Sequence, residues 1–593
     1  MSNKITYFLA AILLITLFVT CVLSVKDGAL TFDEKAHLPA GYSYLVKQDY
    51  RLNPEHPPLA KDLSAIPLLF QDINFPEESS SWKEGSKGTW WVQFNFGDEL
   101  LYQSGNNADQ MIFWGKIPMI FLLIILGLFL FKWTRELRGN KTALLVLTLF
   151  SFSPTFIAHG RLVTTDVAAA LGIVISTYYY LKFLKNSTKK NILLAGIAIG
   201  ISMLFKFSLI LLLPFFAIIT LLFAWLKSRK EEKPLIKNIF KYVFLAVMVA
   251  IIAVVFVIWP VYHVNMMKYP PELQQQEARA WLETTTVPDP LINLNLWMTE
   301  NPVTRPVSQY LLGLLMATNR TATGNTTYFL GTVSAAGWWY YFPVVYFLKV
   351  PLAFHILLLF SVLTTALFIR KDFYKKMKDI IWRNFTEFSM IIFILIYLGT
   401  SITGSLNIGI RHLLPIFPFL YILTSIKARD SIGKIRKPLL RKGVIAFVII
   451  LLIWYVSTSL MIFPHYLTFF NWSVGGAENG YKYVVDSNLD WGQDFKRLEK
   501  WIEEEKIDKI YLDYFGGANP EYYLGEKYVR WDGKNPPEEF PRGNYIAISA
   551  SQIQGGRGIA APDYDQPTDF YMWLNDEKLV KTIGNSIFVY YVE

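Results

Sequence analysis

Apolar residues are gathered into long blocks along most of the chain. Each block has about 17 to 23 residues, the length at which an α-helix crosses a hydrocarbon core of about 30 Å. The sequence therefore predicts a polytopic α-helical membrane protein. About eleven transmembrane helices are expected, near residues 5–25, 112–131, 142–158, 162–183, 190–206, 208–226, 238–260, 350–369, 387–403, 411–427 and 443–463.

Positive charges lie in the connectors between alternate blocks. Together with Lys4, the connectors that begin at residues 132, 182, 227, 370 and 427 hold about half of the 57 Lys and Arg residues. All of them lie on one side if the N-terminus is cytoplasmic, as the positive-inside rule requires. Membrane orientation thus explains the net charge of +10 and argues against a nucleic-acid partner.

This orientation leaves long loops on the outer face, at about 26–111 and 261–349. It predicts a transmembrane catalytic domain over 1–463 and a small extracytoplasmic α/β domain over 464–593. The latter has a helical pattern at 494–506 and β-type runs at 509–515, 545–550, 579–583 and 586–592. Because the cytoplasmic connectors are short, we expect a plasma-membrane protein with its chemistry on the outer face.

Several ionisable residues fall at the outer ends of the predicted spans. Charged groups at membrane depth are costly, so each needs a partner or a water-filled cavity. Asp166 and Lys206 lie in the most apolar surroundings, whereas Arg161 and His412 could equally be ordinary helix-end residues. The full set is Asp33, Glu34, His159, Arg161, Asp166, Lys206, Arg411 and His412.

The two outer loops contain further distinctive stretches. In "RLNPEHPPLAKDLSAIP", tandem prolines precede an apolar run that is too short to span, which predicts an interfacial helix over 58–70. That helix would bring His56 and Lys61 near lipid headgroups. The stretch "GWWYYFPVVYFLKVP" predicts an aromatic belt or a short re-entrant helix.

Carboxylates and cations around one cavity suit group transfer from a phosphate leaving group. Cations stabilise the departing phosphate, while a carboxylate takes the proton of an attacking hydroxyl or amine. A divalent cation held by Asp33 and Asp166 is an open alternative, because hard cations prefer oxygen ligands.

The motifs, taken in order between about residues 31 and 494, resemble a known family. They are "TFDEKAH", "HPPLAK", "HGRLVTTD", Lys206, "GWWYYFPVVYFLKVP", "RHLLPIFP", "HYLTFFNWSVGG" and "DSNLDWGQD". This set is similar to the polyprenyl-phosphate-dependent GT-C glycosyltransferases, and within them to prokaryotic members of the protein O-mannosyltransferase and aminoarabinose transferase superfamily.

The resemblance implies an inverting, mannosyltransferase-like enzyme. It would take a sugar from a polyprenyl (undecaprenyl or dolichyl) monophosphate and transfer it to a protein, lipid or glycan acceptor. Asp33 matches the key acid, with Glu34 beside it; Asp166 matches a second acid, and Lys206 the residue that contacts the carrier phosphate. Further phosphate-binding candidates are Arg411, His412, Arg161, His56 and Lys61. The aminoarabinose transferases have Lys where this chain has His56, and neutral imidazole is a weaker anion ligand.

The C-terminal segment has no counterpart of the β-trefoil found in eukaryotic mannosyltransferases. Asp486, Asp490 and Asp494 in "DSNLDWGQD" either cap a helix or bind acceptor, and the cap is favoured.

Other functions remain open alternatives: a lipid-linked-sugar transporter or flippase, a non-catalytic envelope protein, and an oligosaccharide or phosphoglycerol transferase. Charges at the outer ends, rather than at mid-membrane, favour a transferase over a transporter.

Overall fold

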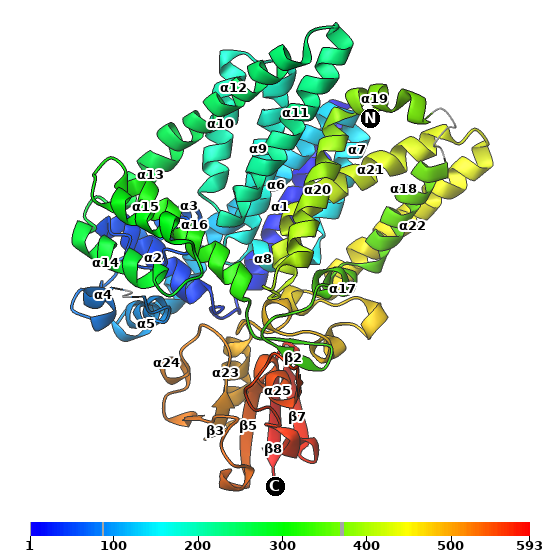
Figure 1. Ribbon diagram of the computed structural model, residues 1–593. Helices are drawn as coiled ribbons and strands as arrows, with labels where there is room; N and C mark the ends of the chain where they lie inside the picture. The colour runs from blue at the N-terminus through cyan, green and yellow to red at the C-terminus, as the bar shows by residue number, and fades with distance from the viewer. Residues whose placement is uncertain (1, 86–87, 368–372) are drawn as a thin grey trace.

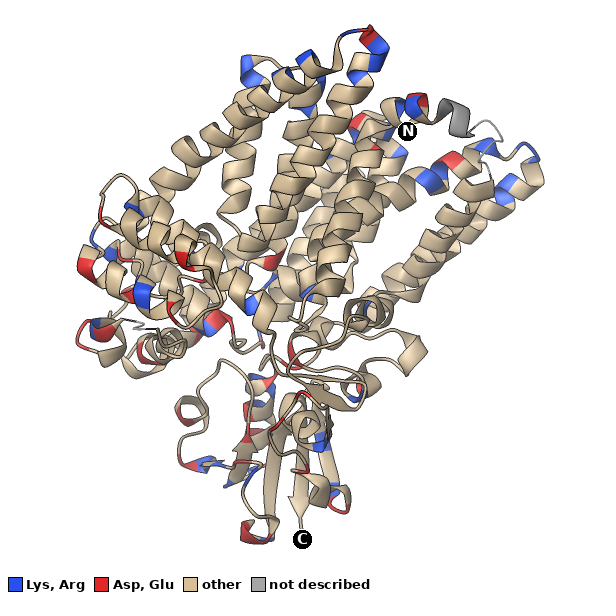
Figure 2. Ribbon diagram, in the orientation of Figure 1, with Lys and Arg blue, Asp and Glu red and all other residues tan. Residues whose placement is uncertain are grey.

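Long helices lie side by side in a bundle, and the C-terminal strands form sheets at one end of it (Figure 1). The computed structural model describes residues 2–85, 88–367 and 373–593. The N-terminus lies near the opposite end of the bundle from the sheets. Lys and Arg gather at that N-terminal end, where the basic connectors join the helices (Figure 2).

Every predicted apolar block coincides with helical structure. The helices are α1 Asn3–Val25, α6 Ala108–Arg138, α7 Asn140–Ser151, α8 Pro154–Gly160, α9 Asp166–Lys185, α10 Lys189–Met203, α11 Leu212–Glu231, α12 Leu235–Ala253, α13 Trp259–Asn265, α18 Leu352–Leu367, α20 Phe385–Thr403, α21 Phe417–Lys434 and α22 Pro438–Met461. Residues 368–369, the end of the eighth block, and 370–372 of its connector lie outside the described residues.

The polytopic helical fold class is confirmed, but the count of eleven spans is not. Within the described ranges, seven helices are long and apolar enough to cross a membrane, or up to nine if each of two bent pairs is one span. The pairs are α7 with α8, bent by 61°, and α17 (Tyr341–Lys349) with α18, bent by 112°. Helix α8 starts anew because Pro154 is its first residue and the Ser153 hydroxyl accepts the Phe156 N–H. The shortfall arises partly because α10 has only 15 residues.

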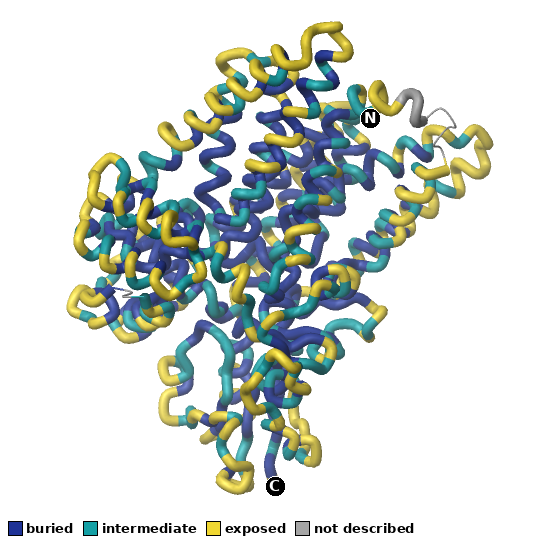
Figure 3. The backbone as a smooth tube through the Cα atoms, viewed as in Figure 1, coloured by how far each residue is buried: buried dark blue, intermediate teal, exposed yellow. Residues whose placement is uncertain are grey.

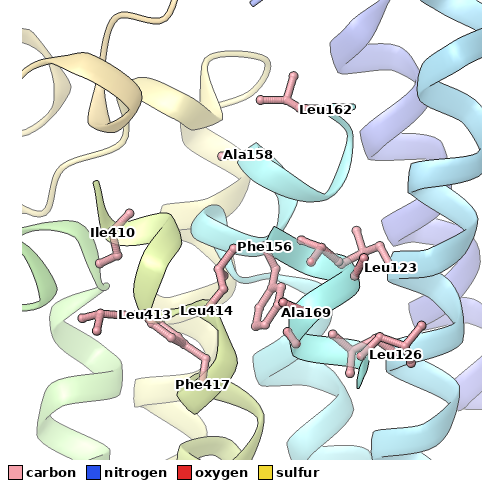
Figure 4. Packing of buried hydrophobic residues seen from close by; sticks show 14 of the residues in the cluster. Leu123, Leu126, Phe156, Ala158, Leu162, Ala169, Ile410, Leu413, Leu414 and Phe417 are labelled. Atoms are coloured by element: carbon pink, nitrogen blue, oxygen red, sulfur yellow. The ribbon is translucent and has the colours of Figure 1, made fainter. Parts of the chain in front are cut away.

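The bundle core packs around α9, in which 83% of the residues of the apolar 18-residue stretch are buried. Figure 4 shows Phe156 and Ala169 facing the leucines of α6, with Leu414 and Phe417 on the other side. Small residues permit this close approach, because a Cβ on Gly160 would lie 2.7 Å from Leu123. Buried residues fill the bundle centre and continue into the junction with the sheets (Figure 3).

Helices of the two long loops flank the bundle. They are α2 Glu34–Lys47, α3 Leu59–Ala65, η1 Ile66–Phe70, α4 Ser80–Glu84, α5 Val92–Asp98, α14 Pro271–Leu282, α15 Asp289–Thr299, α16 Arg305–Thr323 and α17. The helix predicted over 58–70 is confirmed as α3 with η1. Its Ile66, Leu69 and Phe70 side chains are exposed, as they are on a helix that lies along a membrane surface.

The C-terminal segment forms a five-stranded sheet in the order β4-β3-β5-β8-β7. The helices and strands of the segment are α23 Phe495–Glu504, β3 Ile510–Asp513, α24 Pro520–Leu524, β4 Tyr528–Arg530, β5 Asn544–Ser549, α25 Ala550–Arg557, β6 Ile559–Ala560, β7 Lys578–Ile583 and β8 Ile587–Val592. Strands β4, β3 and β5 are parallel, β8 pairs antiparallel with β5, and β7 pairs antiparallel with β8. The helix and the four strands predicted here are confirmed. The short β4 was not predicted.

A second sheet joins the C-terminal segment to the second outer loop. The hairpin of β1 (Thr327–Phe329) and β2 (Thr332–Ser334) pairs with β6 through a parallel β2–β6 contact. Part of the C-terminal segment is thereby fastened to a loop that lies more than two hundred residues earlier in the chain.

Asp62 in α3 makes folding stability depend on pH. Its Oδ2 accepts a hydrogen bond of 2.8 Å from Asn265, and burial raises the pKa of Asp62 to about 7. An unfolded chain gives up this proton near pH 4. Because the folded state holds the proton more tightly, the stability contributed at low pH is lost as pH rises from about 4 to 7.

Asp62→Asn is therefore expected to raise the thermal inactivation temperature more at pH 8 than at pH 5. The gain at pH 8 should exceed the gain at pH 5 by at least about 2 °C. The neutral amide keeps an acceptor for Asn265 and has no charge to bury. Asp72→Asn, at an exposed position of the same loop, is the matched control. An equal gain for Asp62→Asn at both pH values would contradict this explanation.

Candidate active site

Four charged side chains from distant parts of the chain meet where the bundle joins the C-terminal segment. Lys206 Nζ lies 2.5 Å from Asp166 Oδ1, and Arg411 Nη1 lies 2.7 Å from Asp33 Oδ2. Arg411 Nη1 is also 3.7 Å from Asp166 Oδ2. We call Asp33, Asp166, Lys206 and Arg411 the charge cluster. It balances two carboxylates against two cations.

Each member of the cluster stands where a helix begins or a loop ends. Asp33 immediately precedes α2, and Asp166 is the first residue of α9. Lys206 precedes η3 (Phe207–Leu211), and Arg411 lies in the first turn of η5 (Ile410–Ile416). Although Asp33 occupies the N-cap position of α2, its side chain makes no capping bond, so the carboxylate is available to Arg411.

A cavity of about 550 Å³ adjoins the cluster, and we call it the bundle cavity. Asp33, Lys206 and Arg411 line it, while Asp166 lies behind them. Its other polar walls include His56, Arg320 and His412, and its apolar walls include Phe207, Ile210, Leu211 and Leu314. His412 Nε2 is buried and has no hydrogen-bond partner within the described part of the chain. The cavity therefore offers fixed cations and a spare polar atom beside an apolar wall.

The protonation states of the cavity's loop residues follow from burial and charge. Burial alone would raise the pKa of Asp33, but Arg411 outweighs it and holds that pKa below its usual value. Asp33 is thus ionised at neutral pH, as a proton acceptor must be. Burial lowers the pKa of His56 well below its usual value, so its imidazole is neutral.

Residues 29–33, which we call the Asp33 loop, are held by the C-terminal segment. The N–H of Phe32 donates to Trp491 O (3.1 Å), and the N–H of Gly517 donates to Leu30 O (3.2 Å). A Cβ at Gly517 would lie 2.3 Å from Thr31 O, so only glycine permits this approach. The Trp491 ring also lies 4.2 Å from the Arg411 guanidinium. The motif "DSNLDWGQD" therefore positions both Asp33 and Arg411.

Glu34 lies beside Asp33 in sequence but faces another way. Its side chain is fully buried and accepts hydrogen bonds from the N–H groups of Thr31 (2.9 Å) and Val163 (2.8 Å). Lys116 Nζ lies 3.3 Å from its carboxylate. Glu34 lines neither this cavity nor a second one near it. The structure places it as the link between the Asp33 loop and the turn before α9.

Arg161 and Lys61 are likewise buried outside the cavity walls. The Arg161 guanidinium donates to Ser24 O. Lys61 Nζ donates to Asn53 O and His56 O, both at 2.9 Å, and burial lowers its pKa. Lys61 therefore fixes the backbone turn that presents His56 to the bundle cavity.

The three aspartates of "DSNLDWGQD" have three different roles. Asp490 caps a distant helix, because its Oδ2 accepts the N–H of Ser551 in the first turn of α25 at 2.8 Å. The cap interpretation is wrong for Asp494, which precedes α23 but makes no side-chain cap and instead accepts from Ser586 Oγ at 2.7 Å. Asp486 accepts the N–H of Ser487, and burial raises the pKa of Asp486 to about 6.

The cluster does not fit a divalent cation between Asp33 and Asp166. The Arg411 guanidinium lies between the two carboxylates and contacts both. The described residues contain no group of three or more His, Cys, Asp or Glu side chains placed to hold a metal ion.

Arg320 is a cavity residue that the sequence did not single out. Its Nη1 lies 3.2 Å from Glu55 Oε2, and its guanidinium lies 5.0 Å from the Trp90 ring. Trp90 in turn donates to Glu55 at 2.8 Å. The sequence did hold one indication of its role. Arg320 lies in a loop predicted on the outer side, where the positive-inside rule places few cations.

Fold and site together define a multi-pass membrane protein with a cluster of paired carboxylates and cations at one end of its helix bundle. Residues 105–259 match the family model described as dolichyl-phosphate-mannose-protein mannosyltransferase. This segment contains Asp166 and Lys206, and the match confirms the resemblance to the protein mannosyltransferases over this part of the chain.

Similar solved structures include ArnT from Cupriavidus metallidurans in the apo state, with a TM-score of 0.44, 9% identity, and coverage of 99% of this chain and 98% of that one. ArnT from the same organism bound to undecaprenyl phosphate has a TM-score of 0.42 and 11% identity, and the match covers 100% of this chain and 98% of that one. The Archaeoglobus fulgidus oligosaccharyltransferase in the apo form has a TM-score of 0.46 and 11% identity, and the match covers 77% of this chain and 56% of that one. The comparison with curated proteins gives no match.

Proposed function

We propose that this protein is an inverting glycosyltransferase that takes a sugar from a polyprenyl monophosphate carrier and transfers it to an acceptor hydroxyl. The observation that carries the proposal is that Asp33, Lys206 and Arg411 line one cavity, so that a base and two cations reach the same ligand. The family model that matches residues 105–259 supports the lipid phosphate as the carrier.

The reaction follows from the charges. Lys206 and Arg411 bind the phosphate and stabilise the charge that it gains as the bond from the anomeric carbon to the phosphate oxygen breaks. The acceptor oxygen forms the new bond from the opposite face and gives its proton to Asp33. The products are the glycosylated acceptor and the polyprenyl monophosphate, which keeps the electron pair of the broken bond. Asp166 pairs with both cations and fixes their positions.

The carrier's lipid chain suits the apolar wall of the bundle cavity. Phe207, Ile210, Leu211 and Leu314 lie beside the cations, so a headgroup can enter while its chain stays among apolar side chains. Membrane lipids are the natural surroundings of such a carrier.

The outer face of the plasma membrane is the proposed side of the reaction. The basic end of the bundle in Figure 2 is the cytoplasmic end by the positive-inside rule. The C-terminal sheets lie at the opposite end, and Asp33 and Arg411 line a cavity together with Leu512 and Asp513 of β3.

The test uses the full chain in lipid nanodiscs with polyprenyl-phosphate-linked sugars. Mannose is the first sugar to test, because the family model names it. We expect release of polyprenyl monophosphate with transfer or slow hydrolysis of the sugar, and no turnover of GDP-mannose. Failure to consume any lipid-linked sugar, combined with its translocation in liposomes, would instead support a transporter.

Metal removal is expected to leave turnover within about twofold of the untreated rate, because Arg411 already bridges the two carboxylates. The measurement compares initial rates in EDTA with rates in added Mg²⁺ or Mn²⁺. A loss of activity in EDTA that either ion restores would overturn this expectation.

A further inference from the structure

A second cavity, of about 890 Å³, lies between the outer loops and the C-terminal sheet. We call it the junction cavity. Five residues line both cavities, namely Asp33, Trp90, Arg320, Ile408 and Arg411. Asp33 therefore stands in a wall that the two cavities share, and a ligand in either one reaches its carboxylate.

Aromatic side chains surround the junction cavity, including Trp90, Trp91, Trp491, Tyr514, Tyr528 and Trp531. Trp91 is 57% exposed, a large amount for an indole in a folded protein. Trp531, by contrast, is buried, with only 6% of its surface exposed. Its Nε1 has no hydrogen-bond partner among the residues that the structure describes. A buried N–H of this kind costs free energy unless a ligand or solvent atom accepts from it.

Fixed polar groups lie among these rings. Asp513 accepts hydrogen bonds from Gln552 (3.0 Å) and Tyr571, which hold its carboxylate in place. Asp486, Arg530 and Asp532 line the same space. The walls therefore alternate flat apolar faces with charged hydrogen-bonding groups of both signs.

This combination matches the surface of a sugar ring. A pyranose has a face of C–H groups that packs on an aromatic ring, and hydroxyls around its edge that bond to carboxylates, amides and guanidinium groups. A lipid chain would leave these charges without partners, which is costly. The C-terminal segment supplies most of the walls named here.

We propose that the junction cavity binds a saccharide acceptor, packed on Trp91 and bonded to the Trp531 N–H, with one hydroxyl directed at Asp33. This inference rests on the proposed function, which it extends by naming the acceptor class as a glycan. It also gives the C-terminal segment a role as the acceptor-binding part of the enzyme.

The test measures binding to the full chain in nanodiscs by saturation-transfer NMR, without any donor. The probes are neutral gluco-, manno-, galacto- and N-acetylglucosamine trisaccharides, together with a Ser- and Thr-containing hexapeptide. We expect at least one trisaccharide to bind saturably, and Trp91→Ala and Trp531→Phe each to weaken that binding at least tenfold. Trp531→Phe keeps an aromatic ring and removes the N–H together with the rest of the pyrrole part of the indole. Trp339→Ala, at an exposed tryptophan outside both cavities, is the matched control and should not change binding.

Several results would overturn the inference. They are binding of the peptide alone, binding of no trisaccharide, or trisaccharide binding that neither tryptophan variant weakens. Thermal inactivation of each variant shows whether it is folded. Donor turnover by the unaltered protein tests the proposed function separately, because the binding measurement requires no donor.

Discussion

Asp33→Asn is expected to lower the rate of sugar transfer at least about 100-fold while leaving the affinity for the donor nearly unchanged. The amide keeps the shape of the side chain and an acceptor for Arg411, which lies 2.7 Å from Asp33 in the unaltered protein. It cannot take a proton from the acceptor hydroxyl. The measurement compares kcat and donor Kd for the variant and the parent.

The loss should also be independent of pH between about 6 and 8. Arg411 holds the pKa of Asp33 below its usual value, which is near 4, so the carboxylate stays ionised across this range. Asp27→Asn, at an exposed site on the same connection, is the control and should be nearly neutral. Transfer by Asp33→Asn at close to the parent rate would remove Asp33 from its proposed role.

Lys206→Met is expected to lower kcat/KM for the donor about 100-fold, equivalent to about 2.7 kcal/mol of lost stabilisation of the leaving phosphate. It should also destabilise the protein. Asp166 is buried and lies 2.5 Å from Lys206, so the variant leaves its carboxylate with Arg411 alone, at 3.7 Å. Removing one partner of a buried pair typically costs about 3 to 5 kcal/mol.

The double variant Lys206→Met with Asp166→Asn separates these two effects. It should recover much of the lost thermal stability, because no unpaired carboxylate remains, yet stay as inactive as Lys206→Met. Lys182→Met, at the other end of α9 where the side chain is half exposed, is the control. Recovery of activity together with stability would show that Lys206 acts only as a partner for Asp166.

Half of the charge cluster could be predicted from the sequence. Asp166 and Lys206 lie in apolar stretches without a neighbouring partner, so each was expected to face an opposite charge or a cavity. The pairing itself was hidden. Asp33 and Arg411 are 378 positions apart, and only the fold brings them together. The length of the apolar blocks likewise located the long helices, and the β-type runs located the main strands, but neither showed that α7 and α8 bend by 61°.

Side-chain direction was the other quantity that sequence reasoning could not supply. Asp33 and Glu34 are adjacent, yet the start of α2 lies between them and turns Glu34 toward Val163. Lys61 was predicted near headgroups, and its ammonium instead bonds to backbone carbonyls within its own loop. Motif positions thus identified which residues gather, and local backbone geometry decided which of them line the cavity.

The hydrogen bonds that hold the Asp33 loop have a consequence for biosynthesis. The segments around Trp491 and Gly517 that hold this loop are made long after it, when nearly all the helices have already left the ribosome. A nascent or C-terminally truncated chain can therefore build its bundle cavity before its base is in place. We expect such chains to retain lipid phosphate without turning it over, so that activity begins only once the C-terminal segment has folded.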